Sequence, residues 1–390
     1  MKFISLKGIS ENNGSKIIDE ILNIILGNNK DLENLKIVAD VDENLHFSRI
    51  LEIFIKRLNN KNYPISAYTP KRLSIALEKY KKDLKKRNLM EELLSRFYYD
   101  LCISGEKIIL DYPPLLQIEI ASRCNYRCVF CYQSDNTFSD PKSKYMGFMD
   151  FNLFKDLIDE IEGNIPYITF ASRGEPTLHP QFLDILEYCR DKFKDIKINT
   201  NASTLNRKKI EKILDICDTL VFSIDSPDPK IYPKIRVNGN LEKVIKNINL
   251  FNRIRSNHPR NKDIVTRASG VLFNKEIQSQ EDYENLFKPL FDQTAFVEYD
   301  PWEKMYTLPV NNITKPCSQP FHRFFVWFDG SYNCCDMDYK STLSEGAIRF
   351  SKEYSLKEAW NSKIMNNIRD LHHSGKRNQI EPCKRCPLSA

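Results

Sequence analysis

Between residues 115 and 300 the sequence alternates short apolar runs with longer amphipathic segments. Six runs have the length and the β-branched or aromatic content of strands, and they read LLQIEIAS, YITFASR, IKINTN, TLVFSID, IVTRASGVLF and QTAFVEYD. The segments between them repeat apolar residues at helical spacing. Strands that alternate with helices in this way pair in parallel through right-handed crossovers. We therefore expect an α/β fold, a partial (β/α)6 barrel with its site at the carboxyl ends of the strands.

The sequence on either side of this core has different patterns, which together predict three domains. Residues 1–105 contain three short apolar runs and helical segments, and they indicate a small N-terminal α/β domain of unknown role. Residues 106–305 hold a connector and the barrel. Residues 306–390 begin irregularly and continue with a hairpin over 322–335, which turns at an Asp-Gly pair, and a helix over 355–375.

Composition narrows the class of protein. The chain contains 11 cysteines, and its first residues are too polar for a signal peptide. The sequence contains no run of about eighteen apolar residues, the length that a membrane-spanning helix needs, so we expect no membrane span. We expect a cytoplasmic protein, in which so many cysteines favour metal or redox chemistry over disulfides. The net charge of +6 is spread over 390 residues without a basic block, so no nucleic-acid partner is expected.

Three cysteines follow the first predicted strand in the pattern C-x3-C-x2-C, within EIASRCNYRCVFCYQ. Thiolates bind both structural zinc and iron–sulfur clusters, but a structural zinc site usually has four protein ligands. Here no histidine or further cysteine follows within about forty residues. A cubane cluster held by Cys124, Cys128 and Cys131 would leave one iron open to an outside ligand, which favours a cluster over zinc.

This motif, with the aromatic Phe130 before its third cysteine, resembles that of the radical S-adenosylmethionine (radical SAM) superfamily. The resemblance implies a [4Fe-4S] cluster whose open iron binds the amino and carboxylate groups of S-adenosylmethionine (SAM). It implies that an electron, from a donor such as flavodoxin or ferredoxin, cleaves SAM to methionine and a 5′-deoxyadenosyl radical. That radical takes a hydrogen atom from the substrate.

Short motifs at the ends of the following predicted strands resemble the SAM-binding motifs of the same family. SRGEP resembles the G-G-E-P turn that holds the SAM amino group, although an arginine replaces the first glycine. NTN and FSID match contacts to ribose and methionine, and the arginine of YPKIRVNGN matches one that pairs with the methionine carboxylate. The resemblance thus implies a cofactor-binding set of Phe130, Ser172, Arg173, Gly174, Glu175, Thr200, Asn201, Ser223, Asp225 and Arg236.

A second set of four cysteines lies near the end of the sequence, and its members are Cys317, Cys335, Cys383 and Cys386. Gly330 stands five positions before Cys335, which resembles the C…G-x4-C opening of SPASM domains. The resemblance implies the shortened twitch form, in which four cysteines hold one auxiliary [4Fe-4S] cluster. Two alternatives stay open: the four thiolates could close a zinc site, and the adjacent Cys334 could replace Cys335 as the ligand.

A fully ligated cluster near a substrate radical can accept an electron, so we expect an oxidoreductase that dehydrogenates its substrate. The N-terminal pattern resembles βα repeats more than a peptide-binding winged helix, which favours a small, sugar-like substrate over a peptide. A base is expected after the sixth strand, from Glu298 or Asp300, whose side chains could face the same side. The alternatives are a radical SAM peptide maturase or epimerase and, more remotely, a zinc protein without enzymatic activity.

Overall fold

The computed structural model describes residues 111–113, 115–165, 167–193, 195–344, 349–351 and 353–387, together with the backbone of two strands near the N-terminus. The chain divides into two compact units, residues 1–110 and 111–390. In the first unit, β1 (Lys2–Ser5) and β2 (Leu35–Val38) pair in parallel. These two strands coincide with two of the three apolar runs in residues 1–105. The third run and the helices expected in residues 1–105 lie outside the described residues.

In the described part of the second unit, eight strands form one sheet with the order β10-β9-β7-β6-β5-β3-β11-β12. The six strands expected between residues 115 and 300 are all present, and neighbours among them pair in parallel. They are β3 (Leu115–Ile118), β5 (Tyr167–Phe170), β6 (Asp195–Thr200), β7 (Thr219–Ser223), β9 (Val265–Leu272) and β10 (Gln293–Glu298). The predicted α/β fold with a mostly parallel sheet is confirmed.

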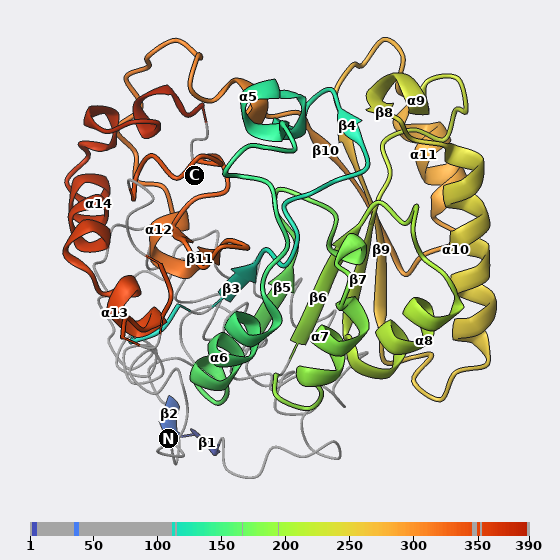
Figure 1. Cartoon of the computed structure of the whole chain (residues 1–390), viewed down its shortest axis with the longest axis horizontal. Helices are drawn as coiled ribbons and strands as arrows, with labels where there is room; N and C mark the ends of the chain where they lie inside the picture. Colours follow the sequence, from blue (N-terminus) through green and yellow to red (C-terminus); the bar gives the residue numbers. More distant parts are fainter. Residues whose placement is uncertain are drawn as a thin grey trace. The chain divides into compact units, whose positions relative to one another are not determined.

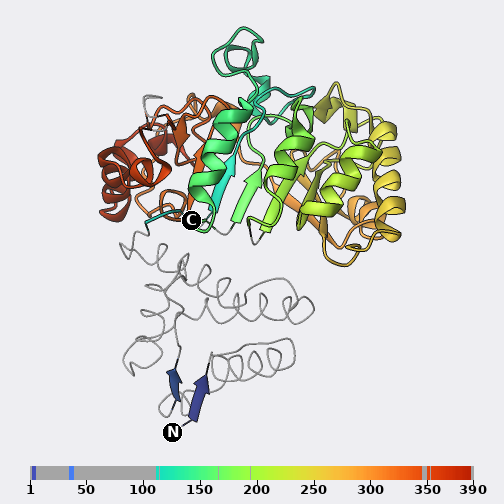
Figure 2. The ribbon, with the colours of Figure 1, turned by 60° about the horizontal axis from the view of Figure 1, so that its bottom comes forward.

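Helices form the crossovers between these strands. They are α6 (Phe151–Ile161), α7 (Phe182–Tyr188), α8 (Arg207–Ile216), α10 (Leu241–Ser256) and α11 (Gln280–Phe287). Several begin at a side-chain cap: the carboxylate of Asp150 accepts the backbone N–H groups of Asn152 and Leu153 at the start of α6. Figures 1 and 2 show α6, α7, α8 and α10 in a row along the same side of the strands.

The C-terminal segment extends the same sheet. β11 (Arg323–Val326) pairs in parallel with β3 and antiparallel with β12 (Tyr332–Asn333). The hairpin predicted over 322–335 is therefore confirmed, and Gly330 adopts the positive φ of +79° that its turn requires. The pairing of this hairpin with the barrel strand β3 is an addition that no local pattern predicts.

The single helix expected over 355–375 is instead two helices, α13 (Leu356–Trp360) and α14 (Lys363–His373). The break occurs because the Ser362 hydroxyl accepts the backbone N–H of Met365 and caps the start of α14. In Figure 1, α13 and α14 lie at one end of the sheet and α10 and α11 lie at the other.

Short elements shape the loops around the sheet. β4 (Arg127–Cys128) and β8 (Arg236–Val237) pair antiparallel, and their register places Cys128 opposite Arg236. The short α-helices are α5 (Asn136–Ser139), α9 (Tyr232–Ile235) and α12 (Gln319–His322). 3-10 helices cover Tyr132–Ser134, Pro176–Leu178, Trp302–Lys304, Arg377–Gln379 and Cys383–Arg385. Within the described ranges, none of the helices has the length and apolar character needed to cross a membrane.

Candidate active site

A cavity of about 360 Å³ lies where the parallel strands end. Its wall includes the whole first cysteine set and every residue expected to bind SAM or to act as a base. These are Cys124, Cys128, Phe130, Cys131, Ser172, Arg173, Gly174, Glu175, Thr200, Asn201, Ser223, Asp225, Arg236, Glu298 and Asp300. The fold thus brings together side chains that are far apart in the sequence, while their individual roles stay predictions.

The three cysteines of the first set share one loop around β4. Burial raises the pKa of the Cys124 thiol to about 12 and that of Cys128 to about 11. Burial also raises the pKa of Cys131, and the nearby charges of Cys128 and Cys124 raise it further. These thiols are hard to ionise in the protein alone. Bound iron would take the place of the thiol proton and make each of them a thiolate ligand. Three such thiols in one loop fit an iron–sulfur cluster with an open iron.

The turn after β5, residues 172–175, packs directly on the cysteine loop. Ser172 has a φ of +108°, which is costly for a residue other than glycine, and its hydroxyl donates to Asp336 Oδ1 at 2.9 Å. At Gly174 a Cβ atom would overlap the carbonyl oxygen of Ala121, so only glycine allows this close approach. The backbone N–H of Glu175 donates to the carbonyl of Arg123 at 3.0 Å.

The buried carboxylate of Glu175 joins this turn to the end of β6. It accepts hydrogen bonds from the Thr200 hydroxyl and from the Asn201 backbone N–H, both at 2.7 Å. Asn201 Nδ2 in turn donates to Asn125 Oδ1 at 3.0 Å, within the cysteine loop. Burial raises the pKa of Glu175, although the hydrogen bonds from Asn201 and Thr200 act in the opposite direction. The residues expected to contact SAM therefore also hold the cysteine loop in place.

Arg236 and Asp225 form a buried ion pair on the cavity wall, with Nε 2.5 Å from Oδ2. The other carboxylate oxygen of Asp225 accepts the backbone N–H of Val271 at 2.8 Å. This pair fixes the arginine at the wall of the cavity, and its expected contact with the methionine carboxylate of SAM stays a prediction.

The two residues expected as bases differ in their surroundings. The Glu298 side chain is 81% exposed and forms an ion pair with Lys275 at 2.9 Å, and this hydrogen bond lowers the pKa of Glu298. Asp300 is less exposed, and burial raises its pKa. A base needs a raised rather than a lowered pKa, so Asp300 is the better candidate.

Several site residues were not foreseen from the sequence. The side-chain oxygens of Gln133 and Asn199 are buried at the cavity, and neither Oε1 of Gln133 nor Oδ1 of Asn199 has a hydrogen-bond partner among the described residues. Both are acceptors that fit the ammonium or hydroxyl groups of SAM or a substrate. Alternation along β6 could have indicated Asn199, which stands two positions before Asn201. No pattern in the sequence indicates Gln133 or Asp336.

The second cysteine set also comes together in the structure. Burial raises the pKa of Cys335, and the charges of Cys317, Cys383, Cys334 and Cys386 raise it further. The four predicted ligands are therefore neighbours, as a fully ligated cluster requires. Cys334 belongs to the same group and stays an alternative ligand.

Comparisons with known proteins agree with this description. A family model described as "Radical SAM superfamily" matches residues 118–266, and a model for the SPASM domain, "Iron-sulfur cluster-binding domain", matches residues 317–387. The chain belongs to the radical SAM superfamily. Within that superfamily it carries a SPASM domain, so its cofactors are SAM, a SAM-binding [4Fe-4S] cluster and an auxiliary iron–sulfur centre. The predicted family and cofactors are confirmed.

Curated relatives match only in part. A tungsten-containing aldehyde ferredoxin oxidoreductase cofactor-modifying protein from Pyrococcus furiosus is 32% identical over 113 residues, 28% of this chain and 30% of the relative. An S-adenosylmethionine-dependent nucleotide dehydratase from Selenomonas ruminantium is 27% identical over 163 residues, 41% of this chain and 56% of the relative. The chain thus spans less than two thirds of the length of these relatives.

One solved structure is similar over most of the chain. Streptococcus suis SuiB, bound to the precursor peptide SuiA, is 15% identical with a TM-score of 0.55, and the match covers 90% of this chain and 94% of SuiB. This similarity shows the fold.

Proposed function

We propose that this chain is a radical SAM oxidoreductase that dehydrogenates a small, sugar-like molecule at a carbon that carries a hydroxyl group. The observation that carries the proposal is the packing between the two cysteine sets. A buried cluster connects them and consists of Tyr132, Phe138, Met146, Met305, Met337, Tyr339 and Cys386. Cys131 of the first set and Cys335 of the second both pack against it.

Aromatic rings fill the space between the two sets. Tyr132, which follows Cys131, stacks on Tyr339 with ring centroids 5.2 Å apart and an angle of 29° between the planes. Tyr339 also contacts Tyr306, with ring centroids 5.0 Å apart. This arrangement supports a role for the auxiliary cluster as a one-electron acceptor close to the radical chemistry. A dehydrogenation needs such an acceptor, whereas a simple hydrogen-atom exchange does not.

The conversion of an alcohol to a carbonyl removes a hydrogen atom from carbon, a proton from the hydroxyl group and one electron. The cofactors supply the radical that takes the hydrogen atom and the centre that takes the electron. The residues of this chain must orient the hydroxyl group and accept its proton. We assign the proton to Asp300, because it lines the cavity and burial raises the pKa of its carboxyl group.

The chain would do this in a reducing compartment such as the cytoplasm, which the 11 cysteines of the sequence support, because so many cysteines there favour metal or redox chemistry. Reduction of the SAM-binding cluster would come from an electron donor such as flavodoxin or ferredoxin.

Anaerobic incubation of the cluster-loaded protein with SAM, a reductant and candidate sugars and peptides tests the proposal. We expect 5′-deoxyadenosine to form in step with a product two daltons lighter than its substrate. A product of unchanged mass would overturn the dehydrogenase assignment and favour an epimerase. A crosslink within a peptide would instead identify a peptide maturase.

Asp300→Asn tests the base. Formation of the carbonyl product should fall by about 10²-fold or more, while cleavage of SAM to 5′-deoxyadenosine continues. Glu298→Gln discriminates between the two carboxylates. If Glu298→Gln loses the carbonyl product and Asp300→Asn forms it in full, the role of the base passes to Glu298.

A further inference from the structure

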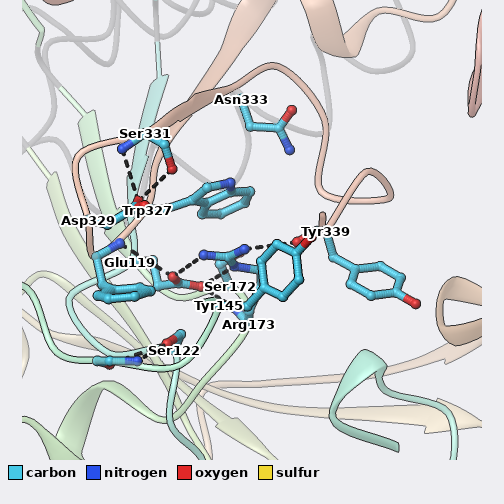
Figure 3. Close-up of polar contacts among 12 residues, drawn as sticks. Glu119, Ser122, Tyr145, Ser172, Arg173, Trp327, Asp329, Ser331, Asn333 and Tyr339 are labelled. Carbon is cyan, nitrogen blue, oxygen red and sulfur yellow. Dashed lines mark hydrogen bonds and ion pairs between the residues drawn. The ribbon is translucent and has the colours of Figure 1, made fainter. Parts of the chain in front are cut away.

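The arginine in the turn resembling G-G-E-P does not extend into the cavity as a free charge. The Arg173 side chain is only 2% exposed, and its guanidinium is bound bidentately by Glu119, with Nε 2.6 Å from Oε2 and Nη2 2.5 Å from Oε1. Nη1 donates to the backbone carbonyl of Tyr339 at 2.8 Å. Figure 3 shows this guanidinium between Glu119 and the Tyr339 carbonyl, with the ring of Trp327 beside it.

Aromatic rings complete the environment of this guanidinium. Its central carbon lies 4.0 Å from the centroid of the Trp327 ring and 5.3 Å from that of Phe138. Trp327 is itself fixed, because its Nε1–H donates to the hydroxyl of Ser341 at 2.6 Å. A planar, delocalised guanidinium satisfies this combination of a bidentate carboxylate and a stacked ring, whereas a lysine ammonium cannot.

Glu119, the partner of this arginine, connects the barrel to the C-terminal hairpin. It is fully buried immediately after β3, and its backbone N–H donates to the Val326 carbonyl at 2.8 Å. The same carboxylate accepts the backbone N–H of Phe328 at 3.4 Å and that of Arg173 at 3.2 Å. The ion pair thus contacts residues 326–328 before the hairpin turn and Tyr339 beyond it.

The neighbours of Arg173 in the turn contact two regions: the C-terminal segment on one side and the wall of the cavity on the other. Ser172 bonds to Asp336, which follows Cys335. Gly174 and Glu175 pack on the cysteine loop and on the end of β6. A displacement of residues 172–175 must therefore change both the SAM-binding wall and the position of the segment that carries Cys335.

We propose that Arg173 is a positioning residue that seats residues 327–341, and with them Cys335, on the turn of the SAM site. The seating itself depends only on contacts within the chain. Its coupling to SAM rests on the proposed radical SAM function, together with the expectation from the G-G-E-P resemblance that SAM contacts residues 172–175. Since such coupling is reciprocal, bound SAM also stabilises the seated segment.

The test compares two buried arginines in the full-length, cluster-loaded protein. Arg173→Lys removes the bidentate and stacked contacts. Arg369→Lys is the matched control, because Arg369 is also buried and lies 3.9 Å from the centroid of Trp360, but it binds the carbonyls of Pro320 and Trp360. The measurements are amide hydrogen exchange of residues 327–341 with and without SAM, and the affinity for SAM.

We expect SAM to slow exchange of residues 327–341 in the unaltered protein. In Arg173→Lys, exchange without SAM should be about tenfold faster, SAM should no longer slow it, and the affinity for SAM should fall about tenfold. Arg369→Lys should leave the affinity for SAM unchanged and should alter the exchange of this segment much less than Arg173→Lys does, because Arg369 lies near Cys334 but makes none of the contacts with Glu119 and Tyr339. Equal effects of the two variants, or unchanged exchange in a folded Arg173→Lys protein, would overturn the proposal.

A second variant covers the case in which Arg173→Lys does not fold. Arg173→Met combined with Glu119→Gln leaves no unpaired charge in the interior, so the protein should fold and show the same faster exchange. Wild-type exchange in this double variant would overturn the seating role. A failure of the unaltered protein to bind SAM would contradict the proposed function instead, while the exchange comparison without SAM would still decide the role of Arg173.

Discussion

The environment of each buried cysteine separates ligand candidates from packing residues. Cys189 and Cys217 follow α7 and α8, are fully buried, and fill apolar space as small side chains. Cys131 is different, because two other thiols lie close enough to raise its pKa beyond the effect of burial. This grouping of three thiols, and not burial alone, supports the prediction that they hold the cluster.

Replacement of Cys131 by alanine should therefore remove one cluster. Two [4Fe-4S] clusters contain about eight irons per chain, and we expect about four in Cys131→Ala, together with loss of the cluster signal in electron paramagnetic resonance that responds to SAM. Iron and sulfide analysis of anaerobically purified protein measures this. Cys189→Ala is the control and should retain about eight irons per chain. The same iron content in Cys131→Ala would show that Cys131 is not a ligand.

The buried side chain of His179 should make the stability of the protein depend on pH. Its Nδ1 accepts the backbone N–H of Gln181, so Nε2 carries the proton and donates to the carbonyl of Met149. Burial lowers the pKa of His179 below its usual 6.5. The unfolded chain then binds a proton more readily than the folded one, so this contribution is complete above about pH 6.5 and is lost as the pH falls.

We expect the free energy of unfolding to decrease between about pH 7 and pH 5, and His179→Gln to weaken this dependence. Chemical denaturation at a series of pH values measures it. An identical slope in His179→Gln and the unaltered protein would assign the dependence to other groups.

At the scale of elements, the turn after β5 depends on close backbone contact. Gly174 allows this turn to touch residues 121–123 of the cysteine loop, and any side chain there would separate the two. We expect Gly174→Ala to cost about 1–3 kcal/mol of stability and to abolish SAM binding, because the loop that holds the cluster moves away from the turn.

Gly163 gives a matched control. It has a φ of +75° with open space around it, so Gly163→Ala should cost about 1 kcal/mol through backbone strain but leave SAM binding intact. Binding titrations followed through the cluster signal compare the two variants. Unchanged SAM affinity in Gly174→Ala would show that the contact between turn and loop does not support the site.

The features that could be predicted from the sequence are those that depend on interactions between residues close together in the chain. The six barrel strands and the strand-end residues depend on local periodicity and short motifs, and the structure brings these residues to one cavity. Arg173 and Glu119 are 54 residues apart, and Ser172 and Asp336 are 164 apart. No local pattern states which buried arginine meets which glutamate, so these partners become visible only in three dimensions.

The sequence also did not predict the break between α13 and α14, for a local reason. Ser362 is compatible with a helix interior, but here its hydroxyl caps the start of α14.

For the second unit as a whole, the barrel and the C-terminal segment share one sheet. β11 covers the edge of β3 with parallel pairs, among them Phe325 opposite Gln117. The buried rings of Phe324, Phe325 and Trp327 lie on this connection. Removal of the segment would expose an unpaired strand edge and leave the carboxylate of Glu119 without the backbone contact from Phe328. The barrel of this chain should therefore not form its site alone.

Two variants separate the segment from the cluster that it carries. Deletion of residues 306–390 should lower the iron content to nearly zero, because the cysteine loop next to β3 loses its support. Replacement of the four cysteines Cys317, Cys335, Cys383 and Cys386 by serine keeps β11 in place and should leave about four irons per chain. Limited proteolysis should digest the barrel of the truncated chain rapidly and spare that of the serine variant. A protease-resistant truncated chain with about four irons would instead show that the barrel assembles its cluster site without β11, and that the C-terminal segment contributes only the auxiliary centre.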